Sequence, residues 1–139
     1  MSTVLKSLRI PQETVQEIEQ LAGESGRDFS SIANDLLAEA IKMRHCPGII
    51  FAEGVTGRRA RVAGTGLEVW EIISTFNGVN QDIKRLRKAF HWLTEQQIRA
   101  AIGYYNAYRD EIDLQIKRNE SWSKEELFKR HPFLSKEHA

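Results

Sequence analysis

The stretch GRRARVAGTGLEVWEI, at residues 57–72, gathers groups that could bind a phosphate. It contains Arg58, Arg59 and Arg61, followed by Gly-Thr-Gly and an apolar run. A P-loop needs a lysine and then a serine or threonine after its glycines, and a dinucleotide-binding fingerprint needs three glycines. Neither pattern is present. We therefore do not expect nucleotide binding, and interpret the stretch as a hairpin arm followed by a turn into a buried helix.

Two interpretations of these arginines stay open. Successive strand residues point to opposite faces, so Arg59 and Arg61 are expected to share one face, with Arg58 in the turn. Two cations on one face can grip DNA phosphates or enter a minor groove. Alternatively, they are surface charges, since an exposed charge cluster is weak evidence for a site. Their partners would then be the nearby glutamates Glu53, Glu68 or Glu71.

The other reactive residues show no catalytic or metal-binding pattern. Cys46 is the only cysteine, so no intramolecular disulfide is expected, and this fits a reducing cytoplasm. Beside His45 and Pro47 it is expected to be a small, semi-buried thiol. No Ser/His/Asp set or carboxylate pair stands out. The spacing of the four histidines does not suit a metal site: His45, His91, His131 and His138. The sequence therefore predicts no enzyme, cofactor or metal site.

Residues 1–45 predict a first domain made of one strand and two helices. Residues 3–10 alternate as a short strand, and Pro11 suits a helix start. After a glycine-containing stop at residues 23–26, Asp28 can cap a second helix. So short a segment cannot bury a sufficient core, and a lone strand leaves its backbone groups unpaired. We therefore expect an intertwined homodimer in which two copies pair their strands antiparallel.

The segments SLRIPQETVQEIEQLA and GRDFSSIANDLL resemble the ribbon-helix-helix family of CopG-, MetJ- and Arc-type repressors, over residues 3–44. Such proteins lay a paired ribbon in the DNA major groove and read bases with its outward side chains. The resemblance implies that Leu5, Ser7 and Arg9 read DNA. It also implies that backbone amides near Asp28 and Phe29 hold a phosphate at a helix N-terminus. The alternative is that the ribbon only dimerises the protein.

Residues 46–116 predict a second domain, a hairpin followed by three helices. Strands are expected at 49–52 and 59–63, and helices near 69–76, 81–89 and 94–107. A capping box of Thr94 and Gln97 opens the last helix. This order suits a helix-turn-helix-like fold, in which the early residues of the last helix, here Gln96 and Arg99, contact bases. A solvated helix face, or a dimer or partner surface, is the alternative.

Two motifs of this domain, AGTGLEVWEI and HWLTEQQIRAAIGYY, resemble family 433 of the domains of unknown function, over about residues 47–113. The resemblance implies a VapB-like antitoxin of a bacterial toxin–antitoxin pair, with a PIN-type ribonuclease as the toxin. Gly66 stands where the family often has arginine, and the upstream GRRAR can supply that charge.

Residues 117–139 predict a charged C-terminal tail with aromatic anchors. Ile112 and Ile116 are expected to extend the preceding helix, and Ser123 to cap a final short helix that ends before Pro132. The tail either packs on the parent domain or orders on a partner protein. The partner-binding candidates are Trp122, Lys124, Phe128, Lys129, Arg130 and Phe133.

Charge and composition bound the remaining possibilities. The 139 residues carry a net charge of +1, with 41% hydrophobic and 28% charged residues, as in globular proteins. The basic excess lies in residues 45–93, where 7 basic and 4 acidic side chains give +3, and includes KRLRK at 84–88. No apolar stretch approaches the ~20 residues of a membrane span, and no secretory signal is apparent.

Together these patterns predict a mainly α protein with small β elements. We expect a ribbon-helix-helix dimer followed by a hairpin with helix-turn-helix-like helices and a helical tail. The expected function is a cytoplasmic, homodimeric, DNA-binding repressor that acts as an antitoxin. The alternative is a dimeric protein-interaction adaptor without an operator, and an enzyme ranks third.

Overall fold

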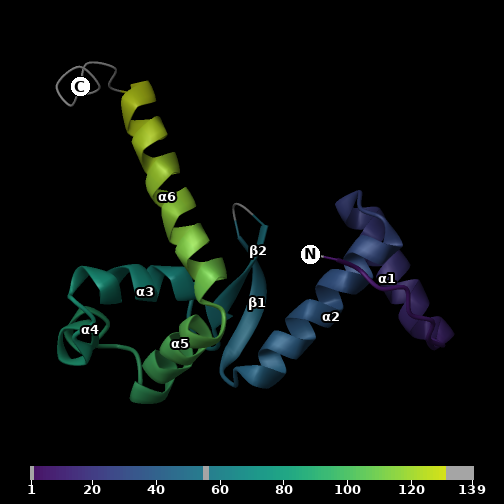
Figure 1. The fold of residues 1–139 in the computed structure, drawn as a ribbon, viewed down its shortest axis with the longest axis horizontal. Helices are drawn as coiled ribbons and strands as arrows, with labels where there is room; N and C mark the ends of the chain where they lie inside the picture. The colour runs from purple at the N-terminus through teal and green to yellow at the C-terminus, as the bar shows by residue number, and fades with distance from the viewer. Residues whose placement is uncertain (1, 55–56, 131–139) are drawn as a thin grey trace. The chain divides into compact units, whose positions relative to one another are not determined.

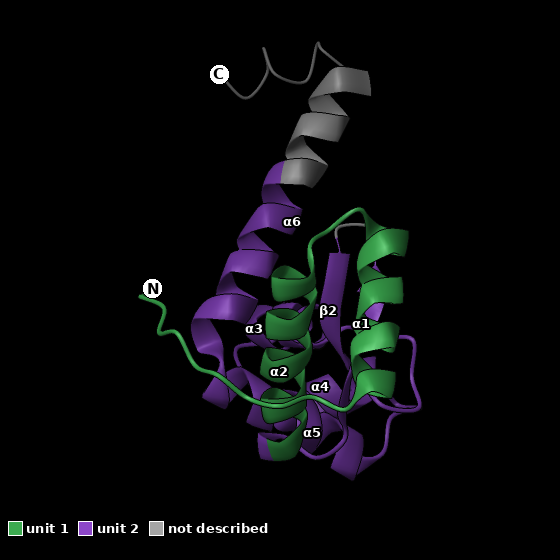
Figure 2. Ribbon diagram, turned by 90° about the vertical axis from the view of Figure 1, so that its right-hand side faces the viewer, with its two compact units in different colours: residues 1–44 green, residues 45–139 purple. Residues whose placement is uncertain are grey.

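The computed structural model describes residues 2–54 and 57–130, with side chains as far as residue 121. Within this part the chain is mainly helical, with one two-stranded antiparallel hairpin between the second and third helices (Figure 1). The predicted mainly α class with small β elements is thereby confirmed. The chain divides into two compact units, which Figure 2 distinguishes by colour: unit 1, residues 1–44, and unit 2, residues 45–139.

Unit 1 consists of helix α1 (Gln12–Ser25), helix α2 (Phe29–His45) as far as Arg44, and the segment that precedes them. The Pro11 carbonyl accepts the Val15 amide at 3.1 Å, so α1 begins directly after the proline, as predicted. Gly26 ends α1 with a φ of 66°, a left-handed conformation that glycine adopts without a steric penalty. The predicted stop between the two helices is therefore confirmed.

Residues 2–11 form neither helix nor strand in the single chain. The strand predicted over residues 3–10 is not formed there. The physical reason is that a strand is stabilised by backbone hydrogen bonds to a neighbouring strand, and in the described part of the chain the only sheet pairs β1 with β2. Leu5, which is 95% exposed, shows how little of the chain covers this segment.

The hydrophobic core of unit 1 is very small. Ile18 and Ala22 of α1 are buried, whereas α2 buries none of its residues. Apolar residues recur at helical spacing in a stripe along one side of α2, and Leu36, Leu37 and Ile41 among them are exposed. The two helices of a single chain thus leave much of their apolar surface uncovered.

Unit 2 begins with a hairpin of strands β1 (Ile49–Gly54) and β2 (Gly57–Val62). The antiparallel register pairs Ile49 with Val62 at one end and Gly54 with Gly57 at the other. Ala60 and Val62, which alternate along β2, are both buried against the helices. Both strands extend further toward the turn than the sequence pattern predicted.

Three helices follow the hairpin: α3 (Val69–Gly78), α4 (Ile83–Ala89) and α5 (Glu95–Ala107). Half of the residues of α3 are apolar, and the helix packs against α4, α5, α6 and β2. Its buried residues are Val69, Ile72, Ile73 and Phe76. The capping box of Thr94 and Gln97 at the start of α5 is confirmed.

The last helix, α6 (Arg109–Arg130), differs from the prediction in two ways. The backbone breaks at Tyr108, with φ −131° and ψ 50°, so Ile112 and Ile116 belong to a new helix and do not extend α5. No separate helix starts at residue 123, because α6 runs through that position. Ile112 is fully buried in the core of unit 2, where α6 packs against α3 and α5, and this burial favours a helix at a point without an N-cap signal.

None of the helices in the described residues is long and apolar enough to cross a membrane.

Candidate nucleic-acid and partner surfaces

The predicted base-reading residues lie on an exposed arm. Leu5, Ser7 and Arg9 are all exposed in the segment before α1. Within the described residues, Arg9 has no ion-pair partner, so its guanidinium is available for an external acceptor. Leu5 can offer only apolar contact at the same surface.

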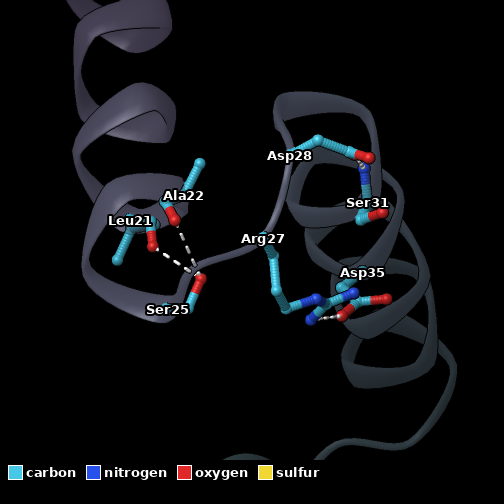
Figure 3. A network of polar contacts seen from close by, with 7 residues as sticks. All are labelled: Leu21, Ala22, Ser25, Arg27, Asp28, Ser31 and Asp35. Atoms are coloured by element: carbon cyan, nitrogen blue, oxygen red, sulfur yellow. Dashed lines mark hydrogen bonds and ion pairs between the residues drawn. The ribbon is translucent and has the colours of Figure 1, made fainter.

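The turn between α1 and α2 is held by polar contacts at both helix ends (Figure 3). The Ser25 hydroxyl donates to the Leu21 carbonyl at 2.8 Å, and the Ser31 amide donates to Asp28 Oδ1 at 2.8 Å. The hydrogen bond from Ser31 lowers the pKa of the Asp28 carboxyl. Asp28 is thus the N-cap of α2, as predicted.

This cap limits the phosphate site that the resemblance implied at the start of α2. The Asp28 carboxylate already accepts from the Ser31 amide, and it places a negative charge where a phosphate would bind. Arg27 offsets only a small part of that charge, because its guanidinium pairs with Asp35 at 2.6 Å (Figure 3). Phe29, the first residue of α2, is half-buried, so its backbone amide and not its ring would contact a phosphate.

The hairpin arginines are placed differently from one another. Arg58 lies in β2 opposite Glu53, so its predicted position in the turn is wrong. The reason is that β1 and β2 pair as far as Gly54 and Gly57, which shortens the turn. Arg59 and Arg61 do share a face of the strand, because the buried Ala60 and Val62 alternate with them.

The hairpin itself holds two of these guanidinium groups. Arg58 Nη2 donates to the Phe51 carbonyl at 3.1 Å, and Arg61 Nη2 donates to the Glu53 carbonyl at 3.5 Å. Arg59 has no ion-pair partner among the described residues. Arg59 is half-buried, and its guanidinium is the one of the three that these two hairpin contacts do not engage.

Two of the three glutamates that could have paired with the arginines, Glu68 and Glu71, hydrogen-bond at the start of α3 instead. Glu68 Oε2 accepts from the Trp70 indole at 2.8 Å, and Glu71 Oε1 accepts from the Glu68 amide at 3.2 Å. These two contacts fix the entry into α3. The sequence analysis did not predict the capping box of Glu68 and Glu71, because the first residue of the motif is usually serine or threonine and here it is Glu68.

The first turns of α5 present the two predicted base-contacting side chains to solvent. Gln96 and Arg99 are exposed, on the side away from buried Ile98 and Ala101. Arg99 Nη2 pairs with Glu95 Oε1 at 2.9 Å across one helical turn. A base contact by Arg99 would therefore have to compete with this pair.

Helix α6 includes the backbone of all but one of the predicted partner-binding residues: Trp122, Lys124, Phe128, Lys129 and Arg130. Their side chains, and the whole of Phe133, lie outside the described residues.

Two tyrosines of α5, to which the sequence analysis gave no polar role, join α5 to α6 through their hydroxyl groups. The buried Tyr104 hydroxyl donates to Glu111 Oε2 at 2.5 Å, and the Tyr105 hydroxyl donates to Asp113 Oδ1 at 2.8 Å. Burial, reinforced by Glu111, raises the pKa of Tyr104 strongly. In the sequence, each contact corresponds to a tyrosine followed seven or eight residues later by an acidic residue. This spacing indicates a contact only if the helix ends between the two residues, as it does at Tyr108.

A third tyrosine contact lies within unit 2 and involves its first residue. Tyr108 Oη lies 3.1 Å from His45 Nδ1, within hydrogen-bond distance, and both residues belong to unit 2. The adjacent Cys46 is buried, which raises the pKa of its thiol. No group of three or more metal-ligating side chains gathers in the described part of the chain.

Comparison of the chain with models of protein families, with curated proteins and with solved structures finds no match.

Proposed function

We propose that the protein is a homodimeric DNA-binding repressor, formed when unit 1 pairs with unit 1 of a second copy. The supporting observation is the exposed apolar surface of unit 1. On α2, Leu36, Leu37, Ile41 and Met43 are 40, 57, 54 and 37% exposed in the single chain. Full burial of each large apolar side chain contributes about 1.5–3 kcal/mol, so covering this stripe is strongly favourable.

A second copy is the partner that suits the arm before α1. Val4, Leu5 and Leu8 are exposed in a segment whose backbone forms no sheet within its own chain. Antiparallel pairing of two such arms would satisfy the backbone groups of both without an exposed lone strand. The same pairing would bring the α2 helices of the two copies close together, because the arm and the helices belong to one short segment.

A paired arm of this kind would present Ser7 and Arg9 on one face. Arginine is suited to the acceptor edge of guanine, and a two-stranded ribbon fits the major groove. Unit 1 has 5 basic and 7 acidic residues, a net charge of −2, and so offers little general attraction to DNA. The hairpin of unit 2, with Arg59, would supply phosphate contacts.

As part of the same proposal, the repressor is the antitoxin of a toxin–antitoxin pair. The tail beyond Ile116 would bind a PIN-type ribonuclease, with its basic and aromatic residues facing the acidic metal site of that enzyme. Co-expression of a neighbouring ribonuclease with the full chain and with a chain lacking residues 117–139 tests this part. Loss of growth rescue on deletion supports it, and unchanged rescue removes the tail from the mechanism.

The DNA-binding part is tested by measuring affinity for the DNA directly upstream of the gene. The control is a duplex of equal length and composition in shuffled order. We expect tighter binding to the upstream DNA, protection of an inverted repeat, and an affinity that falls steeply with salt as counterions are released. Equal affinity for both duplexes would contradict the repressor and favour the adaptor alternative, in which the dimer binds only proteins.

A further inference from the structure

Helix α4 carries an unbalanced positive charge. Four of its seven residues are basic, and all four are exposed: Lys84, Arg85, Arg87 and Lys88. Asp82 caps the helix by accepting from the Lys84 and Arg85 amides, and lies 3.9 Å from the Arg85 guanidinium. In the described part of the chain, the other three cations have no ionic partner.

The helix geometry directs these cations to solvent. Leu86 is fully buried and fixes which side of α4 faces the core. Lys84 and Lys88 are one helical turn apart, on the side opposite Leu86, so their ammonium groups project together. No acidic residue occurs from Ile83 to Leu93, so the immediate surroundings do not neutralise this charge.

An exposed aromatic side chain follows directly after α4. Trp92 is 60% exposed, although tryptophan is a large apolar residue that usually buries most of its surface. Its ring meets those of Phe90 and His91 edge-on, with centroids 5.5 and 5.1 Å apart. The turn is itself ordered, because the Phe90 amide donates to Leu86 and the Leu93 amide to Phe90, each at 3.0 Å.

We propose that α4 and Trp92 form a binding surface for single-stranded nucleic acid. Its cations would contact successive phosphates, and the indole would stack on an unpaired base, the combination by which sequence-tolerant single-strand binders work. A duplex keeps the faces of its bases stacked inside and offers Trp92 nothing comparable. This activity goes beyond the proposed repressor, since it uses neither the arm of unit 1 nor Arg9.

The experiment measures binding of the full chain to a labelled oligonucleotide of about 15 deoxythymidines, near the upper end of known site sizes. Trp92→Ala is expected to weaken binding about five- to a hundredfold, and Trp92→Phe, which keeps a stacking ring, to weaken it less. Lys84→Gln with Lys88→Gln is expected to lower the slope of log affinity against log salt by about 1.4. Lys117→Gln with Arg118→Gln removes the same charge from exposed positions on α6 and should leave the slope unchanged.

Circular dichroism of each variant checks that it is folded, and Arg9→Ala separates this surface from the proposed operator contact. Binding that survives Arg9→Ala but is weakened by Trp92→Ala supports the proposal, even if no operator is found. Equal binding by the wild type and the α4 and Trp92 variants would overturn it. Preference for a random duplex, with no effect of Trp92→Ala, would overturn it as well.

Discussion

Burial and a neighbouring carboxylate together keep the phenol of Tyr104 protonated. The side chain is fully buried and donates to Glu111, and its pKa in the folded chain is raised above the ordinary value of 10.0. A raised pKa means that the folded chain holds the proton more tightly than the unfolded chain. The stabilisation is therefore complete below about pH 10 and is lost as the pH rises further.

For Tyr104→Phe we expect a loss of about 1 kcal/mol in the free energy of unfolding at neutral pH, because one hydrogen bond is removed. The wild type should then lose stability more steeply than the variant above about pH 10. Urea unfolding at a series of alkaline pH values measures both effects. Parallel pH profiles for the two proteins would show that Tyr104 does not govern the alkaline limb.

The opposite sign applies to Asp28, whose pKa is lowered by the hydrogen bond from Ser31. Its contribution to stability is present above the unfolded value of 3.8 and disappears as the pH falls through the lower folded value. Asp28→Ala should lower the melting temperature at neutral pH, with a smaller difference in acid. Asp28→Ser, which can still cap α2, should melt closer to the wild type. An equal loss for both variants would contradict the capping role.

Arg9 tests the base-reading hypothesis at a single side chain. If its guanidinium pairs with a base, Arg9→Ala should cost about 1–3 kcal/mol in binding to the upstream DNA. Arg44→Ala removes the same charge at an exposed position in the last turn of α2. Anisotropy titrations of both variants against upstream and shuffled duplexes measure the effect. A loss that is equal on the two duplexes would assign Arg9 to phosphate contact only.

At the scale of elements, the parts predicted correctly are those with local signals. Thr94 and Gln97 sit at capping-box spacing, and their reciprocal hydrogen bonds are formed at 3.1 and 2.9 Å. Asp28 and Gly26 likewise lie at the helix ends that their chemistry predicts. Such signals need only a few neighbouring residues, and these are visible in the sequence.

The elements that differ from the prediction in the single chain depend on partners remote in sequence or on a second chain. The strand over residues 3–10 needs a second strand from outside its own segment. The break at Tyr108 is stabilised by Tyr104, which meets Glu111 across it, and by burial of Ile112 against α3. No short window of sequence reveals these contacts.

The α5 cap permits a direct test of this view. Thr94→Ala should destabilise the protein by about 0.5–2 kcal/mol, because the Gln97 amide loses its acceptor at the helix start. Thr94→Ser keeps the hydroxyl and should retain most of the stability. Chemical denaturation followed by circular dichroism gives both values. A Thr94→Ser loss as large as that of Thr94→Ala would show that the methyl group, and not the cap, matters.

For the whole molecule, the two units differ in how completely they fold as single chains. Unit 2 encloses a continuous core around α3, whereas unit 1 buries only Ile18 and Ala22 among its described residues. The sequence could predict this imbalance, because a short segment with one strand and two helices has too little apolar area to enclose. It could not predict which exposed side chains carry function. The pairing of Arg99 with Glu95 across one helical turn is a spacing that the sequence shows, whereas the hydrogen bond from Arg58 to the Phe51 carbonyl depends on the register of the hairpin.

The central claim is that unit 1 is completed by a second copy, and sedimentation equilibrium of the full chain at micromolar concentration tests it most directly. Each chain has a mass of 16.0 kDa, so we predict a species of twice that mass. Ile41→Asp, in the exposed stripe of α2, should shift the mass to that of one chain, whereas Ile83→Asp, at a comparably exposed site on α4, should not. A well-folded 16.0 kDa species in the wild type would contradict the dimer, and with it the DNA-reading ribbon.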